Sequence, residues 1–202
     1  TSRGIKPIIG LEAYVAPGSR LTRERGDSSP YHLVMLARNM TGYKNLIALT
    51  TKANLEGFYY KPRIDRELIE KHSEGITVLS GCPSAEFHRR IQEGDREGAM
   101  TVAKYYREVF DGHYYLEVQD HGDEKFTRLN PMIADIGREM GIKVVATNDS
   151  HFTMPDEAEA HDVLLCIGTN ATVDQSGRYK FDGQGYWVKG EDEMHSLFPE
   201  NP

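Results

Sequence analysis

The feature that most constrains the fold of this chain is the alternation of short apolar runs with segments of helical period. Apolar runs typical of strands occupy residues 5–16, 32–38, 76–80, 114–118 and 143–148. Segments with helix-type spacing of apolar residues lie between and after these runs, at residues 40–56, 84–93, 95–110, 124–140, 156–167 and 191–198. Strands that alternate with helices are typical of parallel βαβ units, so the sequence predicts an α/β layered or barrel fold.

Residues with turn and breaker chemistry separate these elements. Residues 17–30 are rich in Arg, Gly and Ser, and we predict a mobile loop there. Lys61-Pro62-Arg63 interrupts the pattern, and Asp65 is placed to cap a short helix through Lys71. Residues 177–189 predict a hairpin. With the last helix, this hairpin forms a segment, residues 169–202, that leads out of the domain.

Composition excludes several classes of protein. The chain has 202 residues, of which 39% are hydrophobic and 27% charged, as is ordinary for one globular domain. No apolar run approaches the roughly 18–20 residues that span a bilayer, and the first four residues lack the features of a signal peptide. The lack of such a run argues against a membrane location. The two cysteines are too few for a disulfide scaffold, which favours the reducing cytoplasm.

The charge balance and the missing motifs narrow the function further. A net charge of −7 argues against a general nucleic-acid coat, which needs a basic surface. It leaves open a metal site that acts on phosphates, because the metal ions supply the positive charge. The sequence contains no GxGxxG, Walker A or GxSxG motif, which weakens the dinucleotide-binding, P-loop and α/β-hydrolase interpretations.

Five metal-ligand side chains lie at or near strand ends. In parallel α/β folds, functional groups gather at the carboxyl ends of strands. Glu12 follows residues 8–11 of the first apolar run, and Cys82 and the pair Asp149 and His151 each come after a later run. His32 stands at the head of a run and fits this rule less well. Carboxylate, imidazole and thiolate groups are all ligands for Zn²⁺, Mn²⁺ or Fe²⁺.

The pair in Asn148-Asp149-Ser150-His151 is the sharpest of these signals. Side chains at i and i+2 beyond a strand project to the same side, so they can share a metal ion. Plainer interpretations stay open at every position. Asp149 can cap a turn while His151 packs at a loop surface, and Cys82 can be a buried core thiol. Glu12 can belong to a surface salt bridge, and His32 can be an ordinary strand-edge histidine.

The other histidines and the arginines are weaker candidates. His121 follows a strand together with Asp120, where a polar turn is the stronger interpretation, and Glu117 can line the same rim. The sequence predicts solvated helix faces for His72, His88 and His195, and a packing or capping role for His161. Arg3, Arg20, Arg23 and Arg25 can contact a phosphate backbone, but a solvated loop is the stronger expectation.

Several segments, taken together and in order along the chain, are specific enough to indicate a protein family. They are Gly4-Ile5-Lys6-Pro7-Ile8-Ile9-Gly10-Leu11-Glu12, His32-Leu33-Val34-Met35-Leu36-Ala37, Lys61-Pro62-Arg63-Ile64-Asp65, Leu79-Ser80-Gly81-Cys82, Ala146-Thr147-Asn148-Asp149-Ser150-His151-Phe152 and residues 156–168. They resemble the N-terminal region of bacterial DNA polymerase III alpha subunits across essentially the whole chain. That region is the polymerase and histidinol phosphatase (PHP) domain. The resemblance implies a distorted seven-stranded β/α barrel that holds metal ions at its carboxyl rim.

The resemblance also implies a site and a function. Glu12, His32, Cys82, Asp149 and His151 match the metal ligands of the family, with Asp149 and His151 in the catalytic centre and Zn, Mn or Fe as the divalent ion. Complete sites support a 3′–5′ exonuclease or related phosphoesterase. In other alpha subunits the domain is structural and docks the proofreading subunit. The parent would be a DNA-directed DNA polymerase that contacts DNA, the proofreading subunit and the sliding clamp. A free-standing PHP phosphatase is a further alternative, disfavoured by residues 61–65 and 156–168.

The chain departs from the family pattern at its front. The resemblance implies a His-x-His motif and an Asp-His pair upstream of Thr1, where they would complete the metal cluster. We therefore expect residues 1–202 to be a PHP domain fragment whose first βα units are missing. The polymerase palm carboxylates are expected to lie outside this segment.

Overall fold

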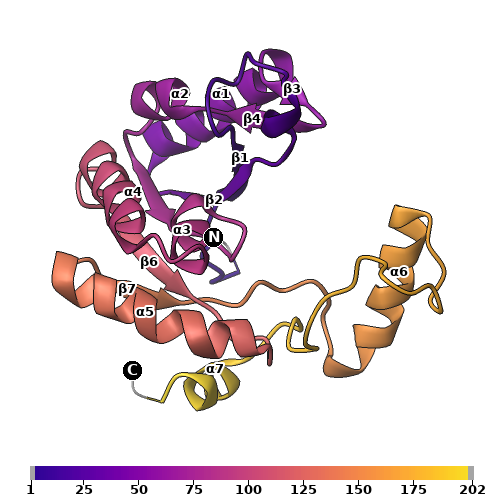
Figure 1. Cartoon of the computed structure of the whole chain (residues 1–202). Helices are drawn as coiled ribbons and strands as arrows, with labels where there is room; N and C mark the ends of the chain where they lie inside the picture. Colours follow the sequence, from indigo (N-terminus) through magenta and orange to yellow (C-terminus); the bar gives the residue numbers. More distant parts are fainter. Residues whose placement is uncertain (1–2, 200–202) are drawn as a thin grey trace. The chain divides into compact units, whose positions relative to one another are not determined.

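Seven strands form one sheet in the order β3-β4-β1-β2-β5-β6-β7, as seen in a computed structural model that describes residues 3–199 (Figure 1). The strands are β1 (Gly10–Val15), β2 (Tyr31–Ala37), β3 (Phe58–Tyr59), β4 (Lys61–Ile64), β5 (Ile76–Leu79), β6 (Tyr114–Val118) and β7 (Val144–Ala146). With the helices described below, this sheet confirms the α/β class.

The alternation of strands and helices predicts parallel strands, but the observed strands do not all run parallel. β1 pairs with β4 and β5 pairs with β6 in the parallel sense, but β2 is antiparallel to both β1 and β5. The connection from β1 to β2 explains the difference. It contains no α-helix, only the short 3₁₀ helix η1 (Arg25–Ser28), whereas a crossover between parallel strands usually contains an α-helix.

The helices lie within a few residues of their predicted positions. They are α1 (Met40–Leu55), α2 (Arg66–Lys71), α3 (Glu86–Gln92), α4 (Arg96–Val109), α5 (Glu124–Met140), the 3₁₀ turn η2 (Pro155–Glu157), α6 (Ala158–Thr169) and α7 (Glu191–Leu197). The Asp65 side chain accepts a hydrogen bond from Leu68 N at 3.1 Å, which confirms the predicted cap of α2. Pro131 lies inside α5 without ending it.

The chain divides into two compact units, which are described separately. The first contains residues 3–117 and 134–144, and the second contains residues 118–133 and 145–199. In the first unit, α1 packs against β1, β2 and β4, and α3 packs against α4. Its core includes the fully buried side chains of Met35, Leu49, Val78 and Leu116. Among the described residues, no helix is long and apolar enough to cross a membrane.

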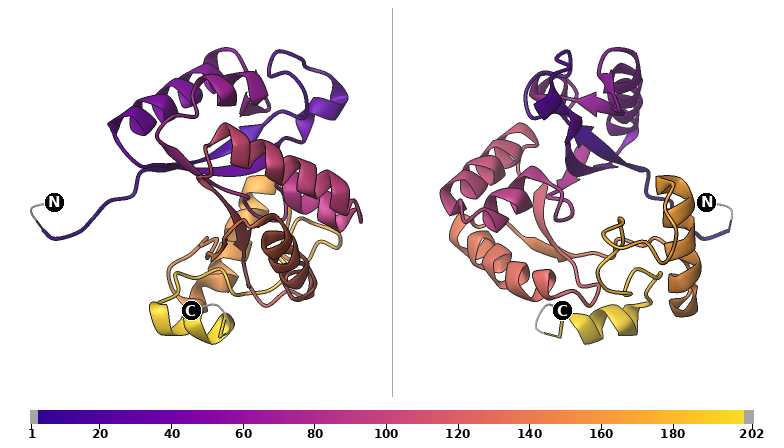
Figure 2. Two further views of the ribbon diagram at one scale, coloured as in Figure 1. Left: turned by 90° about the vertical axis from the view of Figure 1, so that its left-hand side faces the viewer. Right: turned by 45° about the vertical axis from the view of Figure 1, so that its right-hand side comes forward.

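The observed strand β1 is shorter than the strand predicted over residues 5–16. β1 begins at Gly10, which pairs with Leu36, and Ala37 N donates to Ile9 O at 2.8 Å. β2 ends at Ala37, so the antiparallel ladder stops there. The residues that precede Gly10 run away from the sheet as an extended arm (Figure 2), and the Ile8 side chain in this arm is exposed.

Arginine burial ties the segment before β2 to the rest of the first unit. Arg20 is buried and forms ion pairs with Asp65 at 3.1 Å and Glu56 at 2.7 Å, so it is not the solvated loop residue predicted from sequence. Arg63 is fully buried and donates to the backbone oxygens of Arg20 and Thr22. A buried guanidinium needs acceptors for its N–H groups. Carboxylates and backbone oxygens that are distant in the sequence provide these acceptors for both Arg20 and Arg63.

Lys61-Pro62-Arg63 also does not break the fold as predicted. These residues belong to β4, in which Pro62 pairs with Phe58 of β3 and Arg63 pairs with Tyr14 of β1. The three neighbouring strands β3, β4 and β1 therefore form one end of the sheet.

The predicted hairpin at residues 177–189 is wrong. All of this segment is described, and it contains no strand; Trp187 forms only an isolated parallel bridge with Phe152. Its glycines allow a close approach of two backbone segments and do not form a hairpin turn. A Cβ on Gly183 or Gly185 would come within 2.5 or 2.8 Å of the His121 backbone, and Gly185 N donates to His121 O. The segment therefore packs on His121 in place of folding back on itself.

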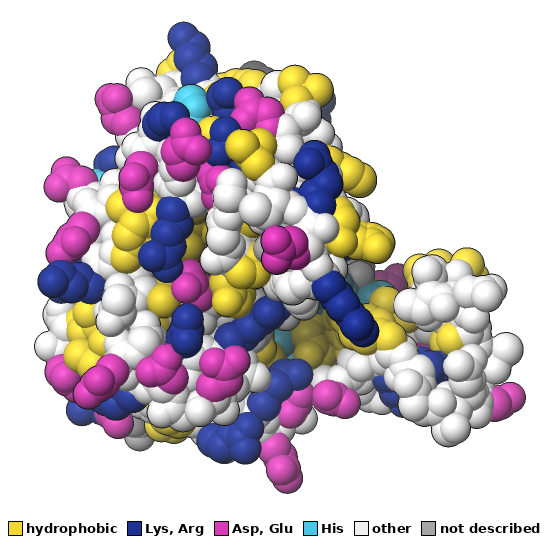
Figure 3. All heavy atoms as spheres, turned by 45° about the horizontal axis from the view of Figure 1, so that its top comes forward, with side chains coloured by type: hydrophobic (Ala, Val, Ile, Leu, Met, Phe, Trp, Pro, Cys, Tyr) yellow, Lys and Arg dark blue, Asp and Glu magenta, His cyan; other side chains and the backbone are white. Residues whose placement is uncertain are grey.

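Charged side chains of both signs are intermixed on the surface. Figure 3 shows one face of the molecule, on which Lys and Arg side chains alternate with Asp and Glu. This distribution agrees with the net charge of −7 and the absence of a basic-coat signature in the sequence.

Candidate metal centre

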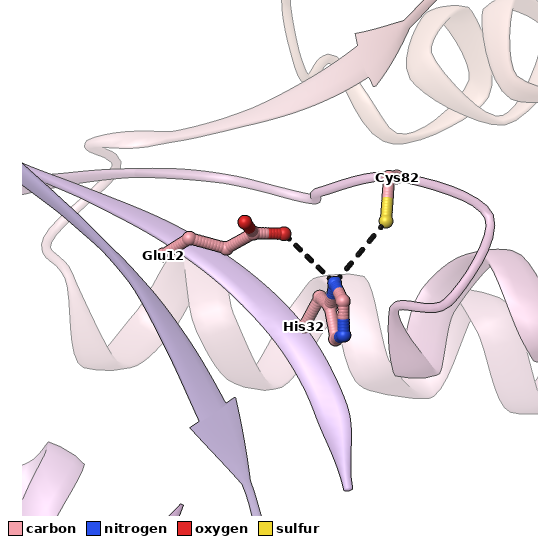
Figure 4. Close-up of side chains that lie close together, drawn as sticks. All are labelled: Glu12, His32 and Cys82. Atoms are coloured by element: carbon pink, nitrogen blue, oxygen red, sulfur yellow. Dashed lines mark hydrogen bonds and ion pairs between the residues drawn. The ribbon is translucent and has the colours of Figure 1, made fainter. Parts of the chain in front are cut away.

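Three of the predicted ligands meet in the first unit (Figure 4). Glu12 comes from β1, His32 from β2, and Cys82 from the loop that follows β5. His32 Nδ1 lies 2.8 Å from Glu12 Oε1 and 3.5 Å from Cys82 Sγ. One ligand atom from each residue can be chosen so that all three lie within 4.8 Å of one another. The structure thus gathers a carboxylate, an imidazole and a thiol at one point.

Strand register places Glu12 and His32 on the same face of the sheet. Tyr14 lies opposite His32 and Glu12 lies opposite Val34, so Glu12 and His32 are diagonal neighbours across the β1–β2 pair. Diagonal side chains on one face are within reach of each other when they are long.

The direction of β2 brings Cys82 to the same place. Val34 pairs with Leu79 in the antiparallel sense, so the first residues of β2 lie beside the chain that leaves β5. Gly81 makes this approach possible. It has φ of +84°, and a Cβ there would lie 3.2 Å from His32 O. His32 fitted the strand-end rule poorly in sequence because that rule assumed a parallel strand.

The electrostatics of the cluster favour a positive charge at its centre. The hydrogen bond with Cys82 and then that with Glu12 raise the pKa of His32 to about 10, against a smaller opposing effect of burial. The side chains of His32 and Glu12 are 26% and 50% exposed, so the cluster is open to solvent. A metal cation can therefore enter and take the place of the imidazolium proton.

The donor set fits a divalent transition metal. Imidazole nitrogen and thiolate sulfur are the ligands that Zn²⁺ prefers, and carboxylate oxygen suits Zn²⁺, Mn²⁺ and Fe²⁺. Three protein ligands with an open position are typical of catalytic zinc sites, whereas structural sites have four. The three residues of this cluster are by themselves enough for the ligand number of a catalytic site.

Glu117 contacts the backbone of the loop that carries Cys82. It is buried, and its Oε2 accepts a hydrogen bond from Gly81 N at 2.9 Å, next to Cys82. His88 is also buried, which corrects the solvated position predicted for it, and its Nε2 donates to Glu117 O at 3.2 Å. Burial lowers the pKa of His88 to about 4, so it stays neutral. The sequence signal for Glu117 is a carboxylate inside the apolar run Tyr114-Tyr115-Leu116-Glu117-Val118.

The remaining predicted ligands meet in the second unit. His151 Nε2 lies 3.3 Å from Asp149 Oδ1, and their side chains are 36% and 33% exposed. This agrees with the expectation that an Asp-x-His pair projects to one side. The ring of His151 also contacts Phe181, with centroids 4.7 Å apart, and His161, with centroids 5.6 Å apart. The structure places these residues together within their own unit.

His121 and Asp120 occupy structural positions. Asp120 Oδ1 accepts from Gly122 N at 2.9 Å, the polar turn expected from sequence. His121 is buried, stacks on Tyr186 with centroids 4.1 Å apart, and its Nδ1 donates to Gly185 O. His121 therefore holds the segment that carries Tyr186.

The region that contains the three-residue cluster matches a known protein family. The family model described as PHP domain matches residues 1–121, which include Glu12, His32 and Cys82. The chain belongs to the PHP domain family.

The chain is also similar to a particular group of polymerases. It is 41% identical over 200 residues to the DNA polymerase III subunit alpha of Deinococcus radiodurans, covering 96% of this chain and 15% of that protein. It is 40% identical over 203 residues to the subunit of Thermus aquaticus, covering 99% and 17% respectively. For the subunit of Mycobacterium tuberculosis strain H37Rv, the identity is 41% over 216 residues, covering 99% and 18%. The chain thus spans less than a fifth of the length of these relatives, and the resemblance predicted from sequence is confirmed.

Proposed function

We propose that this chain is the metal-binding PHP segment of a replicative DNA polymerase alpha subunit, and that it acts as a phosphoesterase on 3′ DNA ends. The observation that carries the proposal is the Glu12–His32–Cys82 cluster, a donor set for a transition metal inside the region that matches the PHP domain. Similarity to polymerase alpha subunits over nearly the whole chain supports the parent and disfavours a free-standing phosphatase.

Five residues are proposed to hold Zn, Mn or Fe ions: Glu12, His32, Cys82, Asp149 and His151. When bound, such ions polarise a phosphoryl oxygen and activate water for hydrolysis. The chain's own residues would prepare that chemistry. Glu12 orients the His32 ring, Glu117 holds the backbone next to Cys82, and Asp149 orients His151. Partners of this kind fix the direction of ligand side chains and tune their basicity.

Polymerisation and replisome contacts are proposed for the parent protein. DNA synthesis would reside in the larger part of the relatives that this chain does not span, together with contacts to the proofreading subunit and the sliding clamp. Within the parent, the present segment would work in the cytoplasm. Its alternative role is a module that docks the proofreading subunit without turnover.

Metal binding by the chain is tested with Co²⁺, whose thiolate complexes absorb strongly. We expect the wild type to bind Co²⁺ with a sulfur-to-metal absorption band and Cys82→Ser to lose that band. Cys166→Ser is the matched control, because Cys166 is buried in α6 of the other unit. An unchanged band in Cys82→Ser would contradict the site.

Cleavage is tested separately on a primer labelled at its 5′ end. Shortening of the primer from its 3′ end by metal-loaded chain supports the phosphoesterase. Full metal binding without any shortening favours the docking module.

A further inference from the structure

A pocket in the second unit lies beside the Asp149–His151 pair. Its volume is about 290 Å³, and its aromatic wall consists of Phe152, His161, Phe181 and Tyr186. His151 contacts this wall directly, since its ring lies edge-on to Phe181 at 4.7 Å and to Tyr186 at 5.7 Å. His151 of the candidate ligand pair therefore contacts side chains that line the pocket.

We propose that this pocket binds the nucleobase of the terminal nucleotide, an inference that rests on the proposed phosphoesterase function. The aromatic rings match a flat ring system, because bases stack on aromatic side chains regardless of sequence. A volume of about 290 Å³ suits one nucleoside and not a longer stretch of strand. The pocket would thus select a single nucleotide and hold its sugar end toward His151.

Polar groups at the same pocket complete the match to a nucleotide. Lys180 and Gln184 belong to its lining, one as a cation for phosphate and the other as an amide for the edges of a base. Asp162 also lines it, but Arg178 neutralises Asp162 through two hydrogen bonds of 2.7 and 2.5 Å. The Asp162 carboxylate therefore does not oppose a phosphate as a free charge would, and Glu159 is the remaining carboxylate of the lining.

The pocket wall is built to keep its shape. The Arg178–Asp162 pair joins α6 to the segment that carries Phe181, and the Arg178 side chain is only 7% exposed. Tyr186 is buried between His121 and Phe181, with ring centroids at 4.1 and 4.8 Å. A preformed wall loses little conformational freedom when a ligand binds.

The test measures binding of 2′-deoxyadenosine 5′-monophosphate to the 202-residue chain in the presence of a chelator, by ligand-detected NMR. 2-Deoxyribose 5-phosphate, which lacks the base, is titrated in parallel. We expect the nucleotide to bind at least about fivefold more tightly, since stacking one base contributes that much or more. Equal binding of the two compounds, or no binding of the nucleotide at millimolar concentration, would overturn the inference.

Variants of one wall residue locate the site. Phe181→Leu keeps an apolar side chain without a ring and should weaken nucleotide binding about tenfold, whereas Phe181→Tyr should bind like the wild type. Val188→Ala is the control, because Val188 is exposed and outside the pocket lining. Trp187 fluorescence and circular dichroism check that each variant folds. Unchanged affinity in folded Phe181→Leu would also overturn the inference.

The chelator separates this inference from the proposed function. Base-dependent binding without any metal-dependent cleavage would leave the pocket standing and reject the phosphoesterase. Cleavage of DNA without base-dependent binding would support the phosphoesterase and reject the pocket.

Discussion

His32 and Cys82 are 50 residues apart in the chain, yet His32 Nδ1 lies 3.5 Å from Cys82 Sγ. The antiparallel course of β2 brings them together, since it sets the start of β2 beside the end of β5. Glu12 reaches the same nitrogen from β1, at 2.8 Å. The cluster therefore depends on the sheet topology as much as on the identity of its three side chains.

Removal of one ligand should uncouple metal binding from folding. Glu12→Gln keeps the shape of the side chain but removes its charge, so we expect the affinity for Zn²⁺ to fall about tenfold or more. The variant should fold as the wild type does, because the Glu12 side chain is 50% exposed. Competition with a chromogenic chelator measures the affinity. A variant with wild-type affinity would show that Glu12 is not a ligand.

Metal removal should lower the thermal stability of proteins that keep Cys82, namely the wild type and Cys166→Ser. A ligand that binds only the folded state stabilises it in proportion to the logarithm of its concentration over Kd. We expect added Zn²⁺ to raise Tm, and a chelator to reverse the rise, with a much smaller response in Cys82→Ser. Scanning calorimetry measures these shifts. Equal responses in Cys82→Ser and Cys166→Ser would contradict the assignment of Cys82.

Arg20→Ala should destabilise the first unit strongly. The change leaves the Asp65 carboxylate, whose side chain is 5% exposed, without its guanidinium partner. Breaking a buried ion pair by removing one partner costs about 3–5 kcal/mol. Chemical denaturation measures the loss, and Arg23→Ala, at an exposed position in the same segment, should change stability by less than about 0.5 kcal/mol. Similar losses in both variants would mean that the buried pair is not the cause.

His88 should make the first unit sensitive to acid. Burial lowers its pKa to about 4, below the value of about 6.5 expected in the unfolded chain. The unfolded state therefore takes up a proton first, and stability that is complete above pH 6.5 is lost as the pH falls toward 4. The contribution lost between pH 7 and pH 5 is about 2 kcal/mol.

His88→Gln provides the comparison for this titration. It keeps a side-chain donor for Glu117 O but cannot titrate, so its stability should fall less than that of the wild type between pH 7 and pH 5. Because His32 is present in both proteins, its own titration cancels from the difference. Denaturant unfolding at several pH values measures both, and parallel curves would contradict the assignment.

Local patterns account for what sequence analysis predicted correctly. The helices follow from apolar spacing, and the Asp65 cap follows from a carboxylate placed before Leu68 N. The choice of Glu12, Cys82 and His32 as ligand candidates, which stays a prediction, rests on side-chain chemistry and on their positions beside apolar runs. Each of these signals lies within a few residues of the feature that it predicts.

Errors arose where partners lie far apart in sequence. The hairpin at residues 177–189 is replaced by packing on His121, and its glycines are explained only by that distant backbone. His88 is buried by its contact with Glu117, which is 29 residues away. Polar side chains look solvated in sequence unless their distant hydrogen-bond partners are known.

By itself, the sequence determined the α/β class, the positions of the helices, the family resemblance and the chemical types of the candidate ligands, since all of these reside in local periodicity and residue identity. Tertiary structure decided the direction of β2 and the burial of Arg20. It also decided that Glu12, His32 and Cys82 converge on one point. The physical reason is that strand direction and burial are set by hydrogen bonds and packing between segments tens of residues apart, which no local pattern encodes.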